Sequence, residues 1–128
     1  MAAFEVDGID ALIQQMQLEE ARIERNGPAA VLAGAEVLRQ QLEASAPVRT
    51  GGLAGSIRVG KLARDSINGI HCDVYPDGKD PHGERYATIG SVLEYGRSNM
   101  PARPWLRPTA ETAGAAVSAA MAAEIMKD

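Results

Sequence analysis

The sequence has very few aromatic side chains and one cysteine, Cys72: its 128 residues include one tryptophan, one phenylalanine and three tyrosines. A single cysteine excludes an internal disulfide and a cysteine-rich zinc site, and it indicates folding in a reducing cytoplasm. The shortage of aromatic rings leaves the core to small and aliphatic side chains. A thin core of this kind favours stabilisation through oligomerisation.

The sequence also lacks any apolar run near the roughly 20 residues that a membrane span needs. It opens with the acidic Glu5 and Asp7 rather than with a basic stretch, so we expect neither a transmembrane segment nor a secretion signal. The 13 Lys and Arg residues against 17 Asp and Glu give a net charge of -4, which argues against a chain built mainly to coat nucleic acid. The length predicts one compact domain over residues 1–128.

Helical periodicity marks three parts of the sequence. The first predicted helix starts near Asp7, a favourable N-cap, and residues 26–28 break or bend it, because Asn-Gly-Pro combines a left-handed cap residue with a proline. The second starts at Pro28 and ends before Pro47. A last helix carries Pro108 in its first turn. The apolar positions of the three helices are Ile9, Leu12, Ile13 and Met16, then Val31, Ala35, Leu38 and Leu42, then Ala110, Ala113, Val117, Ala120 and Met121.

An extended hairpin is predicted between the helices. Residues 56–62 and 70–75 alternate apolar and polar side chains, and Asn68-Gly69 is a strong signal for a two-residue type I′ turn. Pairing across that turn places Ile67 on the same face as the other apolar residues of the two strands. Those residues are Ile57, Val59, Ile70, Cys72 and Val74.

Two charged residues before the turn, Lys61 and Asp65, fit this register poorly, which indicates a wider turn. Residues 76–85 contain two prolines, two glycines and no apolar period, so they predict an exposed loop. Residues 86–95 are compatible with either a short helix or a strand.

No residue pattern in the chain points to catalysis. Two histidines and the cysteine lie near acidic residues, yet no pair has a recognised spacing for metal ligands. The favoured interpretation is that Cys72 packs in the core and that His71 and His82 are solvated. No serine or cysteine is accompanied by a base in a nucleophilic pattern. We therefore expect no metal, no cofactor and no enzymatic activity, against the alternative of a small hydrolase that uses one of the histidines.

A short stretch of the chain is basic although the whole is acidic. Residues 47–64 contain Arg49, Arg58, Lys61 and Arg64 and no acidic side chain. One interpretation is a strip that faces DNA or a partner. The other, which we favour, is a solvated outer face of a strand, because Arg58 alternates with apolar residues.

The only tryptophan lies in a stiff segment. Residues 100–108 include three prolines, which oppose an ordinary helix or a central strand. Trp105 is the single aromatic side chain of this segment and its one large anchor. It is either an anchor for an adjacent subunit or a local packing contact against the last helix.

Three motifs in this order resemble the head-tail joining proteins of tailed phages, also described as neck or tail-completion proteins. They are an alanine-proline followed by a threonine-glycine turn in residues 46–53, an aromatic-glycine pair in residues 92–96, and a proline-aromatic-arginine segment in residues 100–108. The resemblance implies an α+β fold in which two N-terminal helices and one C-terminal helix pack on a small antiparallel β-sheet. It also implies a structural, non-enzymatic subunit that assembles as a ring where the head meets the tail.

The resemblance implies assembly contacts in the three motifs. The implied partners are other copies of the chain, the head-side connector and the tail-terminator protein, with passive contact to passing DNA and none to a membrane. The expected location is the head-tail junction of the virion, after synthesis in the host cytoplasm. Alternatives are a minor tail component, or a small nucleic-acid-binding module that uses the basic strip. The candidate assembly residues are Pro47, Arg49, Thr50, Gly51, Leu53, Glu94, Tyr95, Gly96, Pro101, Arg103, Pro104 and Trp105, and those that could face DNA or a partner are Arg58, Lys61 and Arg64.

Overall fold

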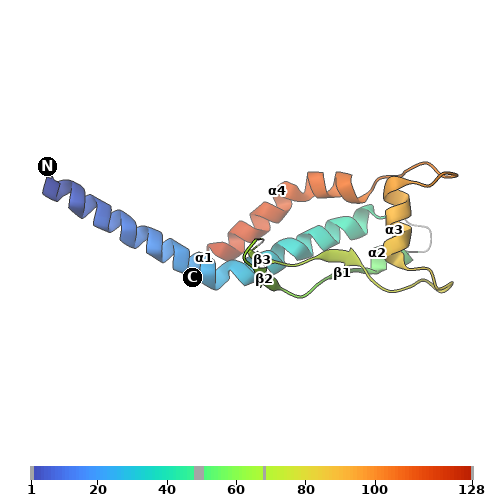
Figure 1. The fold of residues 1–128 in the computed structure, drawn as a ribbon, viewed down its shortest axis with the longest axis horizontal. Helices are drawn as coiled ribbons and strands as arrows, with labels where there is room; N and C mark the ends of the chain where they lie inside the picture. The colour runs from blue at the N-terminus through green and yellow to red at the C-terminus, as the bar shows by residue number, and fades with distance from the viewer. Residues whose placement is uncertain (1, 48–50, 68, 128) are drawn as a thin grey trace.

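The computed structural model describes residues 2–47, 51–67 and 69–127 and shows a mixed helical and β structure (Figure 1). A long helix is followed by a β-ribbon, a short crossing helix and a C-terminal helix. The helices and strands are α1 (Ala2–Ser45), α2 (Gly52–Gly55), β1 (Ile57–Val59), β2 (Ala63–Asp65), β3 (Gly69–His71), β4 (Val74–Pro76), α3 (Tyr86–Tyr95) and α4 (Leu106–Ile125). The α+β class is therefore confirmed.

The prediction of two N-terminal helices is wrong, because α1 continues through residues 26–28. Pro28 removes one backbone hydrogen bond and crowds the preceding turn, which bends a helix without necessarily ending it. Figure 1 shows such a change in the direction of α1 between its blue and cyan portions. Gly27 serves close packing instead of a helix end, since an added Cβ would lie 3.3 Å from the Ile70 Cδ1 atom of β3. The Asn26 amide donates to the carbonyls of Ile125 and Lys127 at the end of α4.

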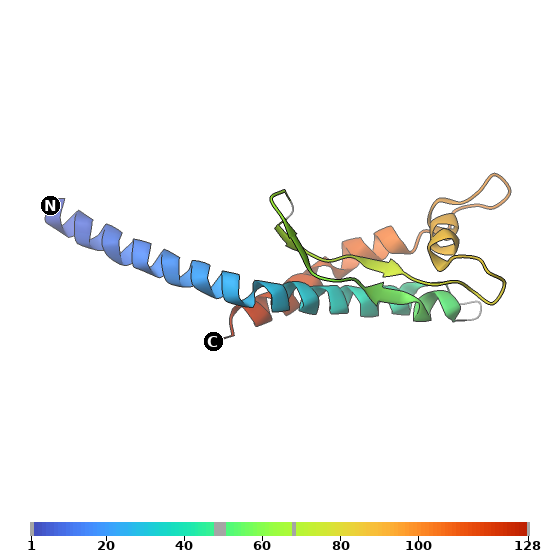
Figure 2. The ribbon, with the colours of Figure 1, turned by 60° about the horizontal axis from the view of Figure 1, so that its bottom comes forward.

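The C-terminal half of α1 packs along α4, and both views show the two helices side by side (Figures 1 and 2). Small buried residues such as Ala30 and Ala113 allow the close approach. Gly34 is the tightest point, because an added Cβ would lie 2.8 Å from Met121 Cγ and 3.2 Å from Val117 Cγ1. Pro108 lies in the first turn of α4, as predicted.

Replacement of Gly34 by alanine is expected to lower the free energy of unfolding by about 1–2 kcal/mol, because overpacking outweighs the better helix propensity of alanine. The matched control is Gly114→Ala in α4, where an added Cβ meets nothing within 4 Å. We expect this control to raise the free energy of unfolding by roughly 0.5–1 kcal/mol. Urea denaturation followed by circular dichroism measures both. Equal stabilisation by the two substitutions would show that α1 and α4 are not tightly packed at Gly34.

The β-ribbon contains two antiparallel pairs, β1 with β4 and β2 with β3. Asp65 pairs with Gly69, so residues 66–68 lie between the strands and the turn is wider than the Asn-Gly signal predicts. Asn68 itself lies outside the described residues. The predicted buried position of Ile67 is wrong, since its side chain is 91% exposed.

The register also changes within the ribbon. The amide of Gly60 donates to the carbonyl of Asp73 at 2.7 Å, whereas Ala63 pairs with His71. Two residues, 61 and 62, therefore lie opposite the single residue Cys72. One extra residue on one strand of an antiparallel pair is a β-bulge. This bulge separates β1 from β2 where one longer strand over residues 56–62 was predicted.

The core lies at the end of the molecule that carries α3. Leu42 and Ala46 of α1 meet Leu53, Ile57 and Trp105 there. Partly buried side chains complete this cluster: Leu38, Ala54, Val74, Tyr86 and Leu93. The opposite end is the N-terminal half of α1, which projects beyond α4 (Figure 2).

Candidate assembly surface

The structure brings the three predicted motifs together around one groove at the α3 end. Pro47, Gly51 and Leu53 of the first motif and Arg103 of the third line this groove. Arg49 and Thr50 lie outside the described residues. Residues 86–95 form a helix, which settles the alternative between helix and strand. The groove has a volume of about 960 Å³.

The groove, which we call the α3 groove, has an apolar floor and a basic edge. Ile89, Val92, Leu93 and Met100 supply half-buried apolar side chains. Arg97 and Arg103 are exposed and line the same space. These groups suit a protein segment that is apolar in its middle and acidic at its border.

An acidic loop forms another part of the groove wall. Asp80 and Glu84 line it together with His82. The Asp80 carboxylate accepts hydrogen bonds from the amides of His82 and Glu84, at 2.9 and 2.8 Å. The Asp80 carboxylate therefore stabilises the conformation of its own loop.

The buried side chain of Glu94 connects α3 to the start of α4 through hydrogen bonds. One carboxylate oxygen accepts the amides of Trp105 and Leu106 at 2.7 and 2.8 Å, and the other accepts the amide of Arg107 at 3.1 Å. Burial raises the pKa of Glu94, but these hydrogen bonds and the Arg107 charge outweigh it, so the pKa lies below its ordinary value. Glu94 caps α4, which has no capping side chain of its own.

Trp105 lies inside its own protomer, where its side chain is 5% exposed. The indole Nε1 donates to the carbonyl of Gly90 at 3.1 Å. The ring packs in the core with Leu42, Leu53 and Ile57. This burial favours the interpretation of Trp105 as a local packing contact, because a ring with so little exposed surface is not presented to a neighbouring subunit.

Gly96 controls the turn after α3. Its φ of 79° and ψ of -179° belong to a region that is essentially restricted to glycine. An added Cβ would also lie 2.8 Å from the Ala102 nitrogen and 2.9 Å from the Met100 oxygen. The chain then turns back, and the amide of Arg103 donates to the carbonyl of Leu93 at 2.6 Å.

Four other candidate assembly residues are exposed around this turn. Tyr95 is 79% exposed at the end of α3. Pro101, Arg103 and Pro104 are exposed in the proline-rich segment. The candidate residues thus divide into a buried group that shapes the turns and an exposed group that is available for contact.

The described part of the basic strip follows the β-ribbon. Arg58 is exposed between buried Ile57 and half-buried Val59, as the alternation predicts. Its guanidinium donates to the carbonyl of Gly55 at 2.7 Å. Arg64 pairs with Glu24 of α1 at 2.7 Å. Two of the basic residues, Arg58 and Arg64, therefore form contacts within the chain.

The described residues contain no group of three or more metal-ligating side chains. Cys72 is half-buried, and this burial raises the pKa of its thiol, which keeps it protonated and weakly reactive. His71 Nε2 lies 3.8 Å from Asp65 Oδ2 on the ribbon. Within the same described ranges, no helix has the length and apolar character that crossing a membrane requires.

Sequence reasoning missed two features. The first is the capping role of Glu94, whose partners lie 11 to 13 residues away across a turn. The second is the uncovered N-terminal half of α1. The apolar spacing of Ile9, Leu12 and Met16 was visible, but nothing in the sequence showed that none of the described helices packs over these side chains.

Comparison with known proteins places the chain in a family. Residues 10–97 match the family described as "Bacteriophage HK97-gp10, putative tail-component". A comparison with curated proteins gives no match, and neither does one with solved structures. The family match includes α1 from residue 10 onward, the β-ribbon, α3 and Gly96. The chain therefore belongs to the HK97 gp10-like family of phage tail components.

Proposed function

We propose that this phage tail component is a ring-forming adaptor at the head-tail junction, in a neck or tail-completion role. The observation that carries the proposal is the apolar surface that the N-terminal half of α1 leaves exposed, with Ile9, Leu12, Ile13, Met16 and Ile23 each 45% exposed or more. A contiguous exposed apolar stripe is typical of an interaction site. A subunit of a larger assembly buries such a stripe against its neighbours.

The proposed role is geometric and involves no catalysis. The partners are further copies of the chain, a head-side connector and a tail-terminator protein. The α3 groove and the exposed residues Tyr95, Pro101 and Pro104 offer one contact surface, and the N-terminal half of α1 offers another. These surfaces lie at opposite ends of the molecule (Figure 1), an arrangement that suits repeated head-to-tail contacts.

Direct nucleic-acid binding is a weaker alternative. It would use Arg58, Lys61 and Arg64 of the ribbon, but Arg64 is paired with Glu24 and Arg58 is hydrogen-bonded to the backbone. No aromatic side chain alternates with these residues for base stacking. We therefore assign these residues at most a passive contact with passing DNA.

The location of the chain in virions tests the proposal. In the phage or prophage that encodes it, an epitope-tagged chain is expected to be labelled by gold-conjugated antibody at the head-tail junction. A stop codon in its gene is expected to leave filled heads and tails unjoined. Labelling along the tail would support the minor tail alternative, and absence of the chain from purified virions would refute a structural role.

A further inference from the structure

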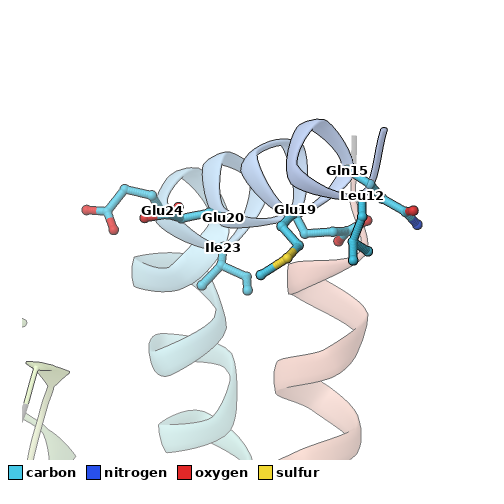
Figure 3. Close-up of a pocket in the computed structure, with 7 residues that line it drawn as sticks. Leu12, Gln15, Glu19, Glu20, Ile23 and Glu24 are labelled. Atoms are coloured by element: carbon cyan, nitrogen blue, oxygen red, sulfur yellow. The ribbon is translucent and has the colours of Figure 1, made fainter. Parts of the chain in front are cut away.

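The N-terminal half of α1 carries an apolar stripe that the described residues of the chain do not cover. We call residues 9–24 the α1 extension. In Figure 3, Leu12 and Ile23 project to the same side of the helix, whereas Glu24 points away from them. Met16, which is 62% exposed, lies between them in the sequence and lines the same shallow hollow of about 530 Å³.

This stripe continues the helix face that β3 and α4 cover farther along. Met16, Ile23, Gly27, Ala30 and Gly34 follow one another at intervals of three, four or seven residues, so they share one face of α1. The last three are buried, and Gly34 approaches α4 side chains closely. The coverage stops where the Asn26 amide binds the last carbonyls of α4.

The charges beside the stripe indicate what can cover it. Glu19 and Glu20 line the hollow together with the apolar side chains. Successive residues are ~100° apart around a helix, which places Arg22 and Arg25 away from Met16. Arg22 nevertheless reaches the Glu19 carboxylate at 3.7 Å, so Glu20 is the carboxylate beside the hollow that forms no ion pair with another described residue. Two copies that paired through this same stripe would bring their Glu20 side chains near one another. The stripe instead suits an apolar surface with a basic edge.

The α3 groove has these properties. Its floor is apolar, and Arg97 and Arg103 are exposed at one edge, whereas the acidic Asp80 and Glu84 line another part of its wall. Neither arginine forms a salt bridge with any other described residue. The groove and the α1 extension lie at opposite ends of the molecule (Figure 1), so they cannot meet within one copy. The 16 residues of the extension are about 24 Å long at 1.5 Å per residue, enough to present four turns to a neighbour.

We propose that the α1 extension of one copy seats in the α3 groove of the next, with Glu20 near Arg97 and Arg103. The contact joins two different surfaces, so an open chain of copies keeps one free extension at one end and one free groove at the other until it closes into a ring. The docking contact deepens the proposed function, because the closed ring rests on it. The contact itself requires only two copies of the chain.

Light scattering of the full chain over a concentration series tests the contact. Wild-type protein is expected to form concentration-dependent oligomers, and Met16→Ser is expected to weaken association about tenfold or more, in line with loss of a central apolar contact. The control is Leu18→Ser, because Leu18 is 72% exposed and lies on the opposite side of α1. Equal effects of the two substitutions, or a strictly monomeric wild-type chain, would overturn the proposal.

Charge reversal tests the predicted partner of the extension. Arg103→Glu is expected to weaken association, and Glu20→Arg in the same chain is expected to restore part of it. Lys61→Glu on the exposed ribbon is the matched control and is expected to leave association unchanged. Failure of Arg103→Glu to weaken association more than Lys61→Glu would remove the groove as the docking site.

Cross-linking distinguishes the head-to-tail contact from pairing of two extensions. In a Cys72→Ser background, one sample carries Met16→Cys and another carries Met100→Cys, and a short bismaleimide is added to each and to their mixture. A cross-linked dimer is expected only in the mixture. A dimer of the Met16→Cys chain alone would refute docking in the groove, and so would no dimer in any sample. Either failure leaves the proposed function standing if the chain is still found at the head-tail junction.

Discussion

Replacement of Trp105 by alanine is expected to lower the free energy of unfolding of the protomer by about 4 kcal/mol, the cost typical of removing a buried aromatic ring. The ring packs with Leu42, Leu53 and Ile57, and in a core with so few large side chains no neighbour can fill the space that it leaves. The substitution also leaves the Gly90 carbonyl without the indole donor. Circular dichroism during urea denaturation measures the loss without relying on tryptophan fluorescence.

Two further variants separate this core role from a direct contact with a neighbour. Trp105→Phe keeps most of the packing and loses the Nε1 hydrogen bond, so a smaller loss of about 2 kcal/mol is expected. Tyr95→Ala removes an exposed ring beside the same turn and is expected to change stability by less than about 0.5 kcal/mol. A Trp105→Ala chain that unfolds at the wild-type urea concentration but no longer associates would place the ring in a subunit interface.

The helices were predictable to the extent that local signals decide them. The apolar spacing in residues 9–16 and 31–42 identifies helix correctly, and Pro108 marks the first turn of α4. The predicted break at residues 26–28 is wrong, because the contacts that keep the helix continuous there come from residues distant in the sequence. Gly27 is needed where β3 packs on α1, and Asn26 binds the end of α4, so tertiary contacts keep a helix that the Asn-Gly-Pro sequence alone would end.

The strands show the same limit of local reasoning. The alternation of apolar and polar residues correctly predicts that Arg58 is exposed and that Ile57 is buried. The register depends on an extra residue at positions 61–62 opposite Cys72, which the alternating pattern does not reveal. Ile67 is apolar and yet lies at the exposed tip of the ribbon. The alternating pattern therefore predicted a buried face for Ile67 wrongly.

The candidate site was predictable as a set of motifs but not as a surface. The sequence identified Pro47, Gly51, Gly96 and Arg103, which the fold brings to one end of the molecule. It could not distinguish the residues that face a partner from those that hold the turns. That distinction follows from burial, which makes Glu94 and Trp105 internal and leaves Arg103 exposed.

Replacement of Glu94 by alanine is expected to lower the free energy of unfolding by about 3 kcal/mol. Three backbone amides at the start of α4 lose a charged acceptor, and each charge-assisted hydrogen bond is worth roughly 1.5–3 kcal/mol before compensation by water. Loss of a helix cap alone costs about 1 kcal/mol. Glu111→Ala is the control, because Glu111 is exposed on α4 and its carboxylate forms an exposed ion pair with the Arg107 side chain. A loss for Glu94→Ala no larger than for this control would refute the capping role.

The pH dependence of stability gives Glu94 a signature that packing does not share. Its pKa in the folded protein lies below the ordinary glutamate value of about 4.3. The unfolded chain therefore binds more protons at this site, and the stabilisation is fully present above pH 4.3 and is lost as the pH falls through the folded pKa. Glu94→Gln keeps the shape but removes the titration, so the difference in free energy of unfolding between wild type and variant is expected to shrink as the pH is lowered from 6 toward 3. A difference that stays constant over this range would show that the Glu94 side chain acts through its shape and not through its charge.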